Sequence, residues 1–259
     1  MIDQSTFLFN LPLFSRSKSS LLKQIEVRLQ TGKNPLLIFT PNPEQVVQSL
    51  SNKSFGNNLR TADVLIPDGV GLVLASRLLA MRTGQRQLQE RITGSDLVVD
   101  ILANSRNMQT LILGGRGYGN KKLPVGDSQC IIGESPLSWS VGYNDVTNQL
   151  AEEEQGIVVL LKELRPSIVF VAFGAPHQEA WIVAHKQLLQ EAGVKVVMSV
   201  GGAFDMLLGL VPRAPLWMQR AGLEWLFRLV QQPWRWHRQL RLLEFIRLVF
   251  REFMLPRRR

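Results

Sequence analysis

Short apolar runs alternate with amphipathic stretches along most of the chain. Five runs have the length of a strand, are rich in Val, Ile, Leu or Phe, and end at Gly, Pro or a Thr-Pro pair. They are PLLIF (35–39), DVLIP (63–67), TLILGG (110–115), SIVFVAFG (167–174) and KVVMSVGG (195–202). Helical periodicity lies between them, at 17–30, 43–50, 70–82, 95–104, 148–164 and 177–192. The alternation predicts an α/β fold with a mostly parallel sheet flanked by helices, and 129–133 is a candidate edge strand.

The composition changes near Val211-Pro212. From Arg213 onward the chain has eleven arginines, no lysine, three glutamates and four of its six tryptophans, which gives this stretch a net charge of +8 out of a formal +9. We therefore expect a Rossmann-like α/β domain at 1–211 and a basic, Arg/Trp-rich helical appendage at 212–259. A charge asymmetry of this kind favours a polyanion or an anionic membrane surface as the partner of the appendage.

Cysteine, hydropathy and histidine content exclude several classes of protein. The lone Cys130 rules out an internal disulfide and fits a reducing compartment. The first residues lack a basic start followed by a long apolar run, so no secretory signal is expected. No window reaches the roughly 18 apolar residues of a transmembrane helix, because the longest candidate is interrupted by Glu244 and Arg247. The histidines lack the spacing of metal ligands, so neither a metal nor another cofactor is predicted.

The carboxyl ends of the predicted strands carry most of the candidate chemistry. In open α/β sheets, ligands bind at that edge. Polar or glycine-rich clusters follow the strands there, at 40–42, 68–71, 114–120, 174–179 and 201–205. We expect all of these clusters to lie on one rim.

Three side chains on this rim suggest specific chemistry. Thr40 and Asn42 add hydroxyl and amide groups where a helix begins, and the free N–H groups of a helix start favour an anion such as a phosphate. The plainer interpretation is that Asn42 only caps the helix. Asp68 is the only acid at its strand end, followed by Gly69, which lets a ligand approach the backbone. Its carboxylate suits a general base, although an aspartate before glycine is also common in turns.

Two further clusters open helices at the same rim. Gln178 and Glu179 are polar residues that follow the fourth strand, and Asp205 follows the last one. Asp205 is placed to accept a hydrogen bond from a base or a ribose, and a helix cap is an equal alternative.

The stretch GGRGYGN (114–120) invites comparison with a dinucleotide-binding loop. Its spacing is not G-x-G-x-x-G, and the polar stretch that follows, with Pro124 and Gly126, predicts no amphipathic helix. A plain glycine loop is the better interpretation, so no nicotinamide cofactor is expected.

Several motifs occur in order along the chain: TPNPEQV, ADVLIPDGVGLVLASRLL, RITGSDL, VAFGAPHQEAWI, VGGAFDMLLGLVPRAPLWMQRAGLEWLFRL and QPWRWHRQ. Together they resemble the WecG/TagA/CpsF family of bacterial glycosyltransferases, over most of 35–116 and 166–238. The resemblance implies metal-independent, inverting transfer of a sugar such as N-acetylmannosamine from a UDP-sugar donor. The implied acceptor is a polyprenyl-diphosphate-linked N-acetylglucosamine, used in cell-surface polysaccharide or teichoic-acid-like synthesis. Residues 117–147 depart from the family's usual helix and strand.

The same resemblance carries roles to individual residues. Asp68 matches the proposed general base, with Thr40 and Asn42 near the reacting sugar. Arg91 and Gln178 match other pocket residues of the family. Gly69, Glu179 and Asp205, taken from the rim itself, complete the predicted substrate pocket. Three tail arginines, Arg228, Arg235 and Arg238, match residues that bind the diphosphate.

The appendage is expected to be both an active-site lid and a membrane anchor. Its second half carries apolar residues at helical spacing, namely Leu242, Leu243, Ile246, Val249 and Phe250. Arginines and tryptophans beside such a stripe suit an anionic headgroup surface. We therefore expect a cytoplasmic protein, peripheral on the inner face of the bacterial cytoplasmic membrane. The alternative is that the stripe packs on the body or on another subunit, which would make a homo-oligomer.

A nucleic-acid-binding protein that uses the Arg/Trp tail is the alternative function. It leaves the rim residues without a role, and the body of the chain is nearly neutral. No nucleic acid is therefore expected as a partner.

Overall fold

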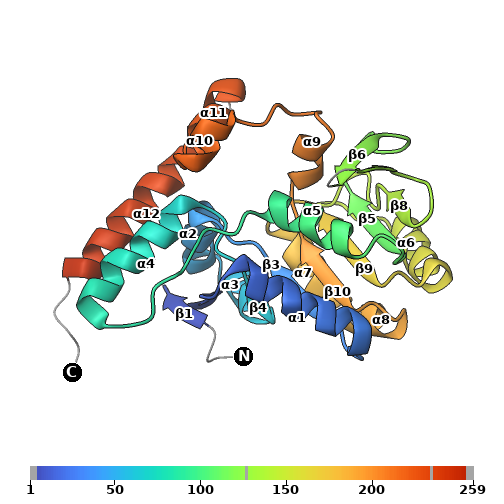
Figure 1. Cartoon of the computed structure of the whole chain (residues 1–259), viewed down its shortest axis with the longest axis horizontal. Coiled ribbons are helices and arrows are strands. Elements are labelled where there is room, and N and C mark those ends of the chain that lie inside the picture. Colours follow the sequence, from blue (N-terminus) through green and yellow to red (C-terminus); the bar gives the residue numbers. More distant parts are fainter. Residues whose placement is uncertain (1–4, 126–127, 234–235, 255–259) are drawn as a thin grey trace.

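The computed structural model describes residues 5–125, 128–233 and 236–254 (Figure 1). Its main sheet has eight strands in the order β1-β2-β4-β3-β10-β9-β5-β8. They are β1 (Ser5–Leu8), β2 (Leu11–Phe14), β3 (Leu36–Phe39), β4 (Val64–Leu65), β5 (Thr110–Gly114), β8 (Leu137–Ser140), β9 (Ile168–Ala172) and β10 (Val196–Ser199). β1 and β2 pair antiparallel, and the other neighbours in this sheet pair parallel. The predicted α/β class is confirmed, and the apolar runs form β3, β4, β5, β9 and β10.

Helices cover both faces of this sheet. One core contains residues of α1 (Lys18–Thr31), α5 (Gly94–Asn104) and α9 (Ala203–Leu207). The other contains residues of α2 (Pro43–Ser51), α3 (Lys53–Arg60), α4 (Val70–Thr83), α6 (Ala151–Leu164), α7 (His177–Ala184) and α8 (Lys186–Glu191). Alternate residues of β3 enter the two cores, with Leu36 and Ile38 on one side and Leu37 and Phe39 on the other. Burial on both faces explains why the strands are continuous apolar runs.

The N-terminal hairpin was not predicted from the sequence. β1 and β2 are joined by Phe9 and Asn10, whose φ angles of 49° and 64° lie in the left-handed region. Two-residue hairpin turns of this kind are usually signalled by Asn-Gly or Asp-Gly. Phe-Asn gives no such signal, so the sequence pattern missed two strands of the sheet.

The strand predicted at 129–133 is present, but its expected place at an edge of the main sheet is wrong. β7 (Ser128–Ile131) instead pairs antiparallel with β6 (Lys122–Val125) in a separate two-stranded sheet. The edge of the main sheet is β8, which pairs with β5. Its sequence LSWS alternates polar and apolar residues on an exposed edge, so it lacked the apolar run that marks a buried strand. The helix expected at 177–192 is divided at His185 into α7 and α8.

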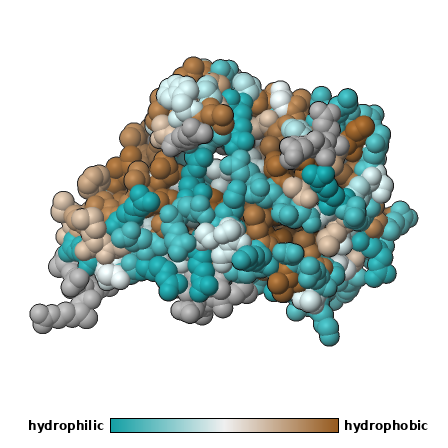
Figure 2. Space-filling model, in the orientation of Figure 1, coloured by the Kyte–Doolittle hydropathy of each residue, from teal (hydrophilic) through white to brown (hydrophobic). Residues whose placement is uncertain are grey.

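The tail forms α10 (Leu216–Arg220), α11 (Glu224–Gln231) and α12 (Trp236–Met254). α12 packs along α2 and α4 (Figure 1). It buries Phe245, Leu248 and Val249 against the body, whereas Leu243 and Phe250 remain 64% and 54% exposed. The predicted stripe is therefore split between two faces, and Figure 2 shows apolar side chains over α12 and α4 at the left of the view. None of the helices described is long and apolar enough to cross a membrane.

Candidate active site

A cleft of about 1180 Å³ opens at the carboxyl ends of the parallel strands. Each of the five clusters expected on the rim contributes to its lining, for example through Thr40, Asp68, Tyr118, Gln178 and Gly201. The prediction of one shared rim is therefore confirmed. Residues in the first turns of α2, α4 and α5 line the cleft as well, and α4 begins without a side-chain cap on its first N–H groups. Such a cleft favours an anionic ligand.

Asn42 is a helix cap in the structure. Its side-chain oxygen accepts a hydrogen bond from the Gln45 N–H at 2.9 Å, and the Gln45 side chain accepts one from the Asn42 N–H at 3.2 Å. This reciprocal arrangement fixes the start of α2. Thr40 is buried beside it and donates from Oγ1 to the Ser199 carbonyl at 3.3 Å. Both residues border the cleft, and their contact with a substrate stays a prediction.

Asp68 lies partly buried just before the start of α4. Burial raises the pKa of its carboxyl group to about 6, although the Arg91 charge and a hydrogen bond from the Gly94 N–H lower it. Glu224 adds to the rise and Arg228 opposes it. A carboxylate with this pKa is ionised at neutral pH and still basic enough to accept a proton, as a general base requires.

Gly69 and Gly71 allow α4 to begin close to α2. Gly69 has a φ of +125°, and a Cβ atom there would lie 3.0 Å from Cδ of Pro43. A Cβ atom on Gly71 would lie 3.1 Å from Cγ of the same proline. The glycines therefore bring two helix starts together beside Asp68, which accounts for the Asp-Gly-x-Gly pattern in packing terms.

Gln178 and Glu179 point to different surroundings. Gln178 lines the cleft, and its Oε1 accepts a hydrogen bond from the Gly201 N–H at 2.9 Å. Glu179 is absent from the described lining and is only 1% exposed, with Oε1 accepting from Gln178 Nε2 at 2.8 Å. Burial raises the pKa of Glu179. The substrate contact expected of Glu179 does not match this position, because one helical step of about 100° turns it from the cleft into the core.

Asp205 also borders the cleft, at the start of α9. The hydroxyl group of buried Tyr118 donates to Asp205 Oδ1 at 2.7 Å. A Cβ atom on Gly115 would lie 2.2 Å from the Tyr118 ring, so this glycine loop is folded over a tyrosine. That packing explains Gly115, and it is consistent with the expected plain glycine loop.

The tail covers the cleft through charged side chains. Arg91 of the body pairs with Glu224 of α11 at 2.9 Å. Arg213 contacts Asp96 at 2.7 Å and lies 3.9 Å from Glu224. Sequence reasoning missed Glu224 and Arg213, although Glu224 is conspicuous as the only acid between Arg213 and Gln239.

Arg228 of α11 borders the cleft beside this pair. Its guanidinium group contacts the sulfur of Met206, which is a weak hydrogen-bond acceptor. No carboxylate of the described residues lies within 4.0 Å of the guanidinium group. Arg228 is therefore a cation available to an anionic ligand. Arg235 lies outside the described residues, as does the side chain of Arg238 in α12.

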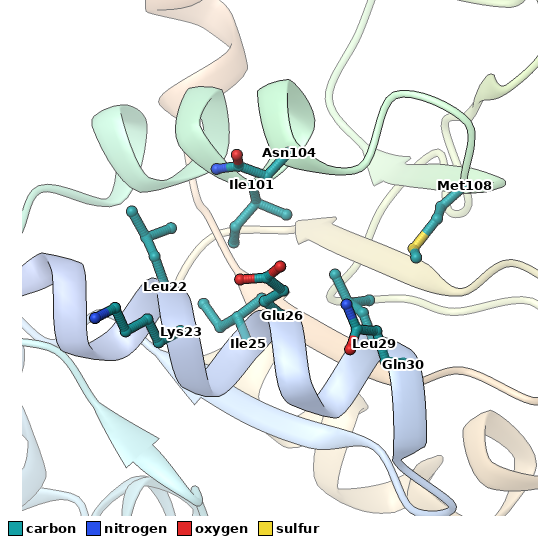
Figure 3. A pocket seen from close by; sticks show the side chains of 9 residues that line it. All are labelled: Leu22, Lys23, Ile25, Glu26, Leu29, Gln30, Ile101, Asn104 and Met108. Atoms are coloured by element: carbon teal, nitrogen blue, oxygen red, sulfur yellow. The ribbon is translucent and has the colours of Figure 1, made fainter.

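A second, smaller cavity of about 250 Å³ lies between α1 and α5 (Figure 3). Its walls are mainly aliphatic, with Lys23 and Glu26 among the polar residues. It is built from helix surfaces rather than strand ends, so it offers no comparable chemistry. Within 5–125, 128–233 and 236–254, no cluster of three or more His, Cys, Asp or Glu residues could hold a metal ion.

The fold and the cleft define an α/β enzyme. A partly buried acid lies on the floor of a cleft that is bordered by helix starts and covered by a basic tail. Such a site suits a substrate that carries phosphate, and comparison with known proteins gives the class of enzyme.

The chain belongs to the glycosyl transferase WecG/TagA/CpsF family, whose model matches residues 6–259. The expected family is confirmed, and the protein is a glycosyltransferase. It is 32% identical to an N-acetylglucosaminyldiphosphoundecaprenol N-acetyl-beta-D-mannosaminyltransferase of Bacillus subtilis strain 168, over 96% of this chain and 92% of the relative.

Two further relatives carry the same name. The protein of Bacillus spizizenii strain W23 is 29% identical over 90% of this chain and 86% of its own length. The protein of Staphylococcus aureus strain MRSA252 is 28% identical over 75% of this chain and 72% of its own length. Their name states the group that these relatives transfer and the lipid-linked sugar that receives it.

Proposed function

We propose that this enzyme transfers an N-acetylhexosamine, with N-acetylmannosamine as the first candidate, from a UDP-sugar to a polyprenyl-diphosphate-linked N-acetylglucosamine. The observation that carries the proposal is Asp68, a carboxyl group with a pKa of about 6 that lines a large cleft. The names of the relatives support the choice of sugar and acceptor.

In the proposed reaction, Asp68 accepts the proton of the acceptor hydroxyl group while the hydroxyl oxygen attacks the anomeric carbon of the donor sugar. The bond from that carbon to the β-phosphate oxygen breaks, and UDP leaves with the bonding electrons. This single displacement inverts the anomeric centre. General-base assistance of this kind contributes roughly 100- to 10,000-fold in rate.

The leaving diphosphate needs positive charge and hydrogen-bond donors. We assign these to the N–H groups at the start of α4, which has no side-chain cap, and to Arg228, whose guanidinium contacts only a weak acceptor among the described residues. Arg235 and Arg238 are proposed to join Arg228 when the tail closes over the cleft. Arg91 is paired with Glu224 and becomes available to a phosphate when that pair separates.

The remaining rim residues are proposed to position the donor. Thr40, Asn42, Gly69 and Gln178 line the same cleft as Asp68 and are assigned to the reacting sugar. Asp205 is assigned to the nucleoside, with Tyr118 holding its carboxylate in place. Glu179 is proposed to position Gln178 rather than to contact a substrate.

The proposal divides the chain into a catalytic domain at 1–211 and an appendage at 212–259. The outer face of α12 exposes Leu243 and Met254 beside Arg247 and Arg251. Apolar side chains with flanking arginines favour an anionic membrane surface, where each basic residue contributes about 1 kcal/mol. The enzyme is therefore proposed to work peripherally on the inner face of the cytoplasmic membrane, where its lipid-linked acceptor lies.

The test is UDP release by the purified protein with lipid vesicles and a panel of UDP-sugars. Each donor is offered with and without polyprenyl-diphosphate N-acetylglucosamine in the vesicles. Release that requires the acceptor, from one donor, supports the proposal. No release with any donor, or release that ignores the acceptor, contradicts it.

A further inference from the structure

One end of the cleft is apolar and lies between two helices. From α4 it is lined by Gly71, Leu74, Ala75 and Leu78, which follow the spacing i, i+3, i+4, i+7. From α12 it is lined by Leu242, Phe245, Ile246, Val249 and Phe250, at i, i+3, i+4, i+7, i+8. Each helix thus presents one continuous apolar stripe to the same space. We call this space the α4–α12 groove.

The groove is open rather than filled by the protein. Leu74 is 56% exposed, Ile246 44% and Phe250 54%, although all three line the cleft. Figure 2 shows apolar surface over these two helices. Apolar side chains at the bottom of the groove are buried instead, with Phe245 at 2% and Ala75 at 4% exposure. A buried floor with exposed apolar walls suits a hydrocarbon chain.

The groove is continuous with the catalytic end of the cleft. Asp68 directly precedes α4, so the candidate base lies at the end of the stripe that begins with Gly71. Arg241 stands at the start of the α12 stripe, where Nη1 donates to Gln48 Oε1 at 3.3 Å, and both residues line the cleft. The cleft is therefore lined by the Asp68 carboxylate, the Arg241 guanidinium group and the apolar α4–α12 groove.

We propose that the α4–α12 groove holds the first isoprene units of the acceptor lipid, with Arg241 on the acceptor diphosphate. This inference rests on the proposed function and deepens it. It follows from the order of groups in the acceptor, in which a sugar hydroxyl, a diphosphate and an isoprenoid chain succeed one another. Asp68 precedes the α4 stripe and Arg241 precedes the α12 stripe, and all of these residues line one cleft. In this proposal the protein binds the isoprenoid chain directly, in addition to being located at the membrane that contains the acceptor.

The test uses acceptors that share N-acetylglucosamine diphosphate and differ in the attached group. A methyl ester is compared with esters of one, two and three isoprene units, in solution without vesicles or detergent. The wild-type enzyme is expected to show kcat/KM at least tenfold higher for three units than for methyl, since removing groups from an apolar pocket costs roughly 10-fold or more. A ratio near one would overturn the proposal.

The variants Leu74→Asn and Ile246→Asn, singly and together, make the groove polar without adding charge. In these variants, the ratio of kcat/KM for the three-unit acceptor to kcat/KM for the methyl acceptor is expected to fall close to one. The matched controls are Met81→Asn on α4 and Leu240→Asn on α12, which are 79% and 52% exposed and do not line the cleft. The control variants are expected to keep the wild-type ratio. If the ratio also fell in the controls, the preference would come from apolar surface in general, and the groove proposal would be overturned.

A binding measurement separates this inference from the proposed reaction. Farnesyl diphosphate and methyl diphosphate are titrated into the full chain by calorimetry. Farnesyl diphosphate is expected to bind at least tenfold more tightly, and Leu74→Asn with Ile246→Asn is expected to remove the difference. If this contrast appears while no acceptor supports transfer, the proposed function fails and the groove stands. Equal binding of both probes would overturn the groove whether or not transfer occurs.

Discussion

The rim of the body and the tail that covers it hold their functional side chains in different ways. On the rim, Gln178 is 1% exposed and is fixed by Glu179 and Gly201 through buried hydrogen bonds. In the tail, α11 has no buried residue among those described, and Glu224 is held by partly exposed ion pairs. Such pairs contribute about 1 kcal/mol or less. The body therefore supplies a rigid reaction site, and the tail supplies charges on a cover that can separate at low cost.

The largest effect is expected on the rigid side, at Asp68. Asp68→Asn keeps the size of the side chain and removes the proton acceptor, so kcat is expected to fall roughly 100- to 10,000-fold. UDP release with the full acceptor measures the loss, and donor binding by calorimetry serves as the control for folding. A variant with more than a tenth of the wild-type rate would show that another group takes the proton.

The next largest effect is expected in the tail, at Arg228. Arg228→Ala removes a cation that contacts only the Met206 sulfur among the described residues, so its loss leaves no buried carboxylate unpaired. We expect kcat to fall by about 100- to 1000-fold, as for other charge donors to a leaving group. Arg60→Ala, at an exposed position of α3, is the matched control and is expected to keep the wild-type rate. Equal rates for the two variants would remove Arg228 from the site.

Arg91 and Glu224 join the two regions, and their charges act on Asp68 with opposite signs. Arg91 lowers the pKa of Asp68 and Glu224 raises it, with a net value of about 6. Because the base must be deprotonated, activity should fall as pH drops through that value. Arg91→Gln is expected to move this fall above pH 6 and Glu224→Gln to move it below, as measured by kcat/KM against pH. A shift of the pH midpoint in the same direction in both variants would contradict the electrostatic account.

The smallest effect is expected behind the rim, at Glu179. Glu179→Gln keeps an acceptor for Gln178, and because burial raises the pKa of Glu179, a neutral group is tolerated there. Glu179→Leu removes that acceptor and leaves a buried amide unpaired, at a cost of about 1–3 kcal/mol in the free energy of unfolding. We expect the donor KM to rise in the leucine variant. In the glutamine variant it should stay within about twofold of wild type, which corresponds to a loss of about 1 kcal/mol or less in donor binding free energy. Identical KM values in both variants would remove the positioning role.

The parts of the fold that sequence predicted are those with strong local signals. β9 and β10 are continuous apolar runs because helices cover both faces, and such runs are visible without a structure. The hairpin at Phe9-Asn10 was missed because its turn lacks the Asn-Gly or Asp-Gly signal, and β8 was missed because LSWS is not an apolar run.

The residues of the candidate site were also predictable only where the sequence carries a local signal. The rule that ligands bind at strand ends located Thr40, Asp68 and Asp205 on one cleft. It could not separate Gln178 from Glu179, because only the direction of α7 decides which neighbour faces the cleft. It also could not predict that Glu224 returns from the tail to pair with Arg91, since that contact joins residues far apart in sequence.

The claim that Asp68 is the catalytic base is tested most directly by the pH dependence of kcat/KM in the wild type and in Asp68→Asn. The account predicts that the wild-type value falls below a midpoint of about pH 6 with a slope of one, and that the residual activity of Asp68→Asn lacks this fall. A fall at the same pH in Asp68→Asn would contradict the account, because the titrating base would then be a different group.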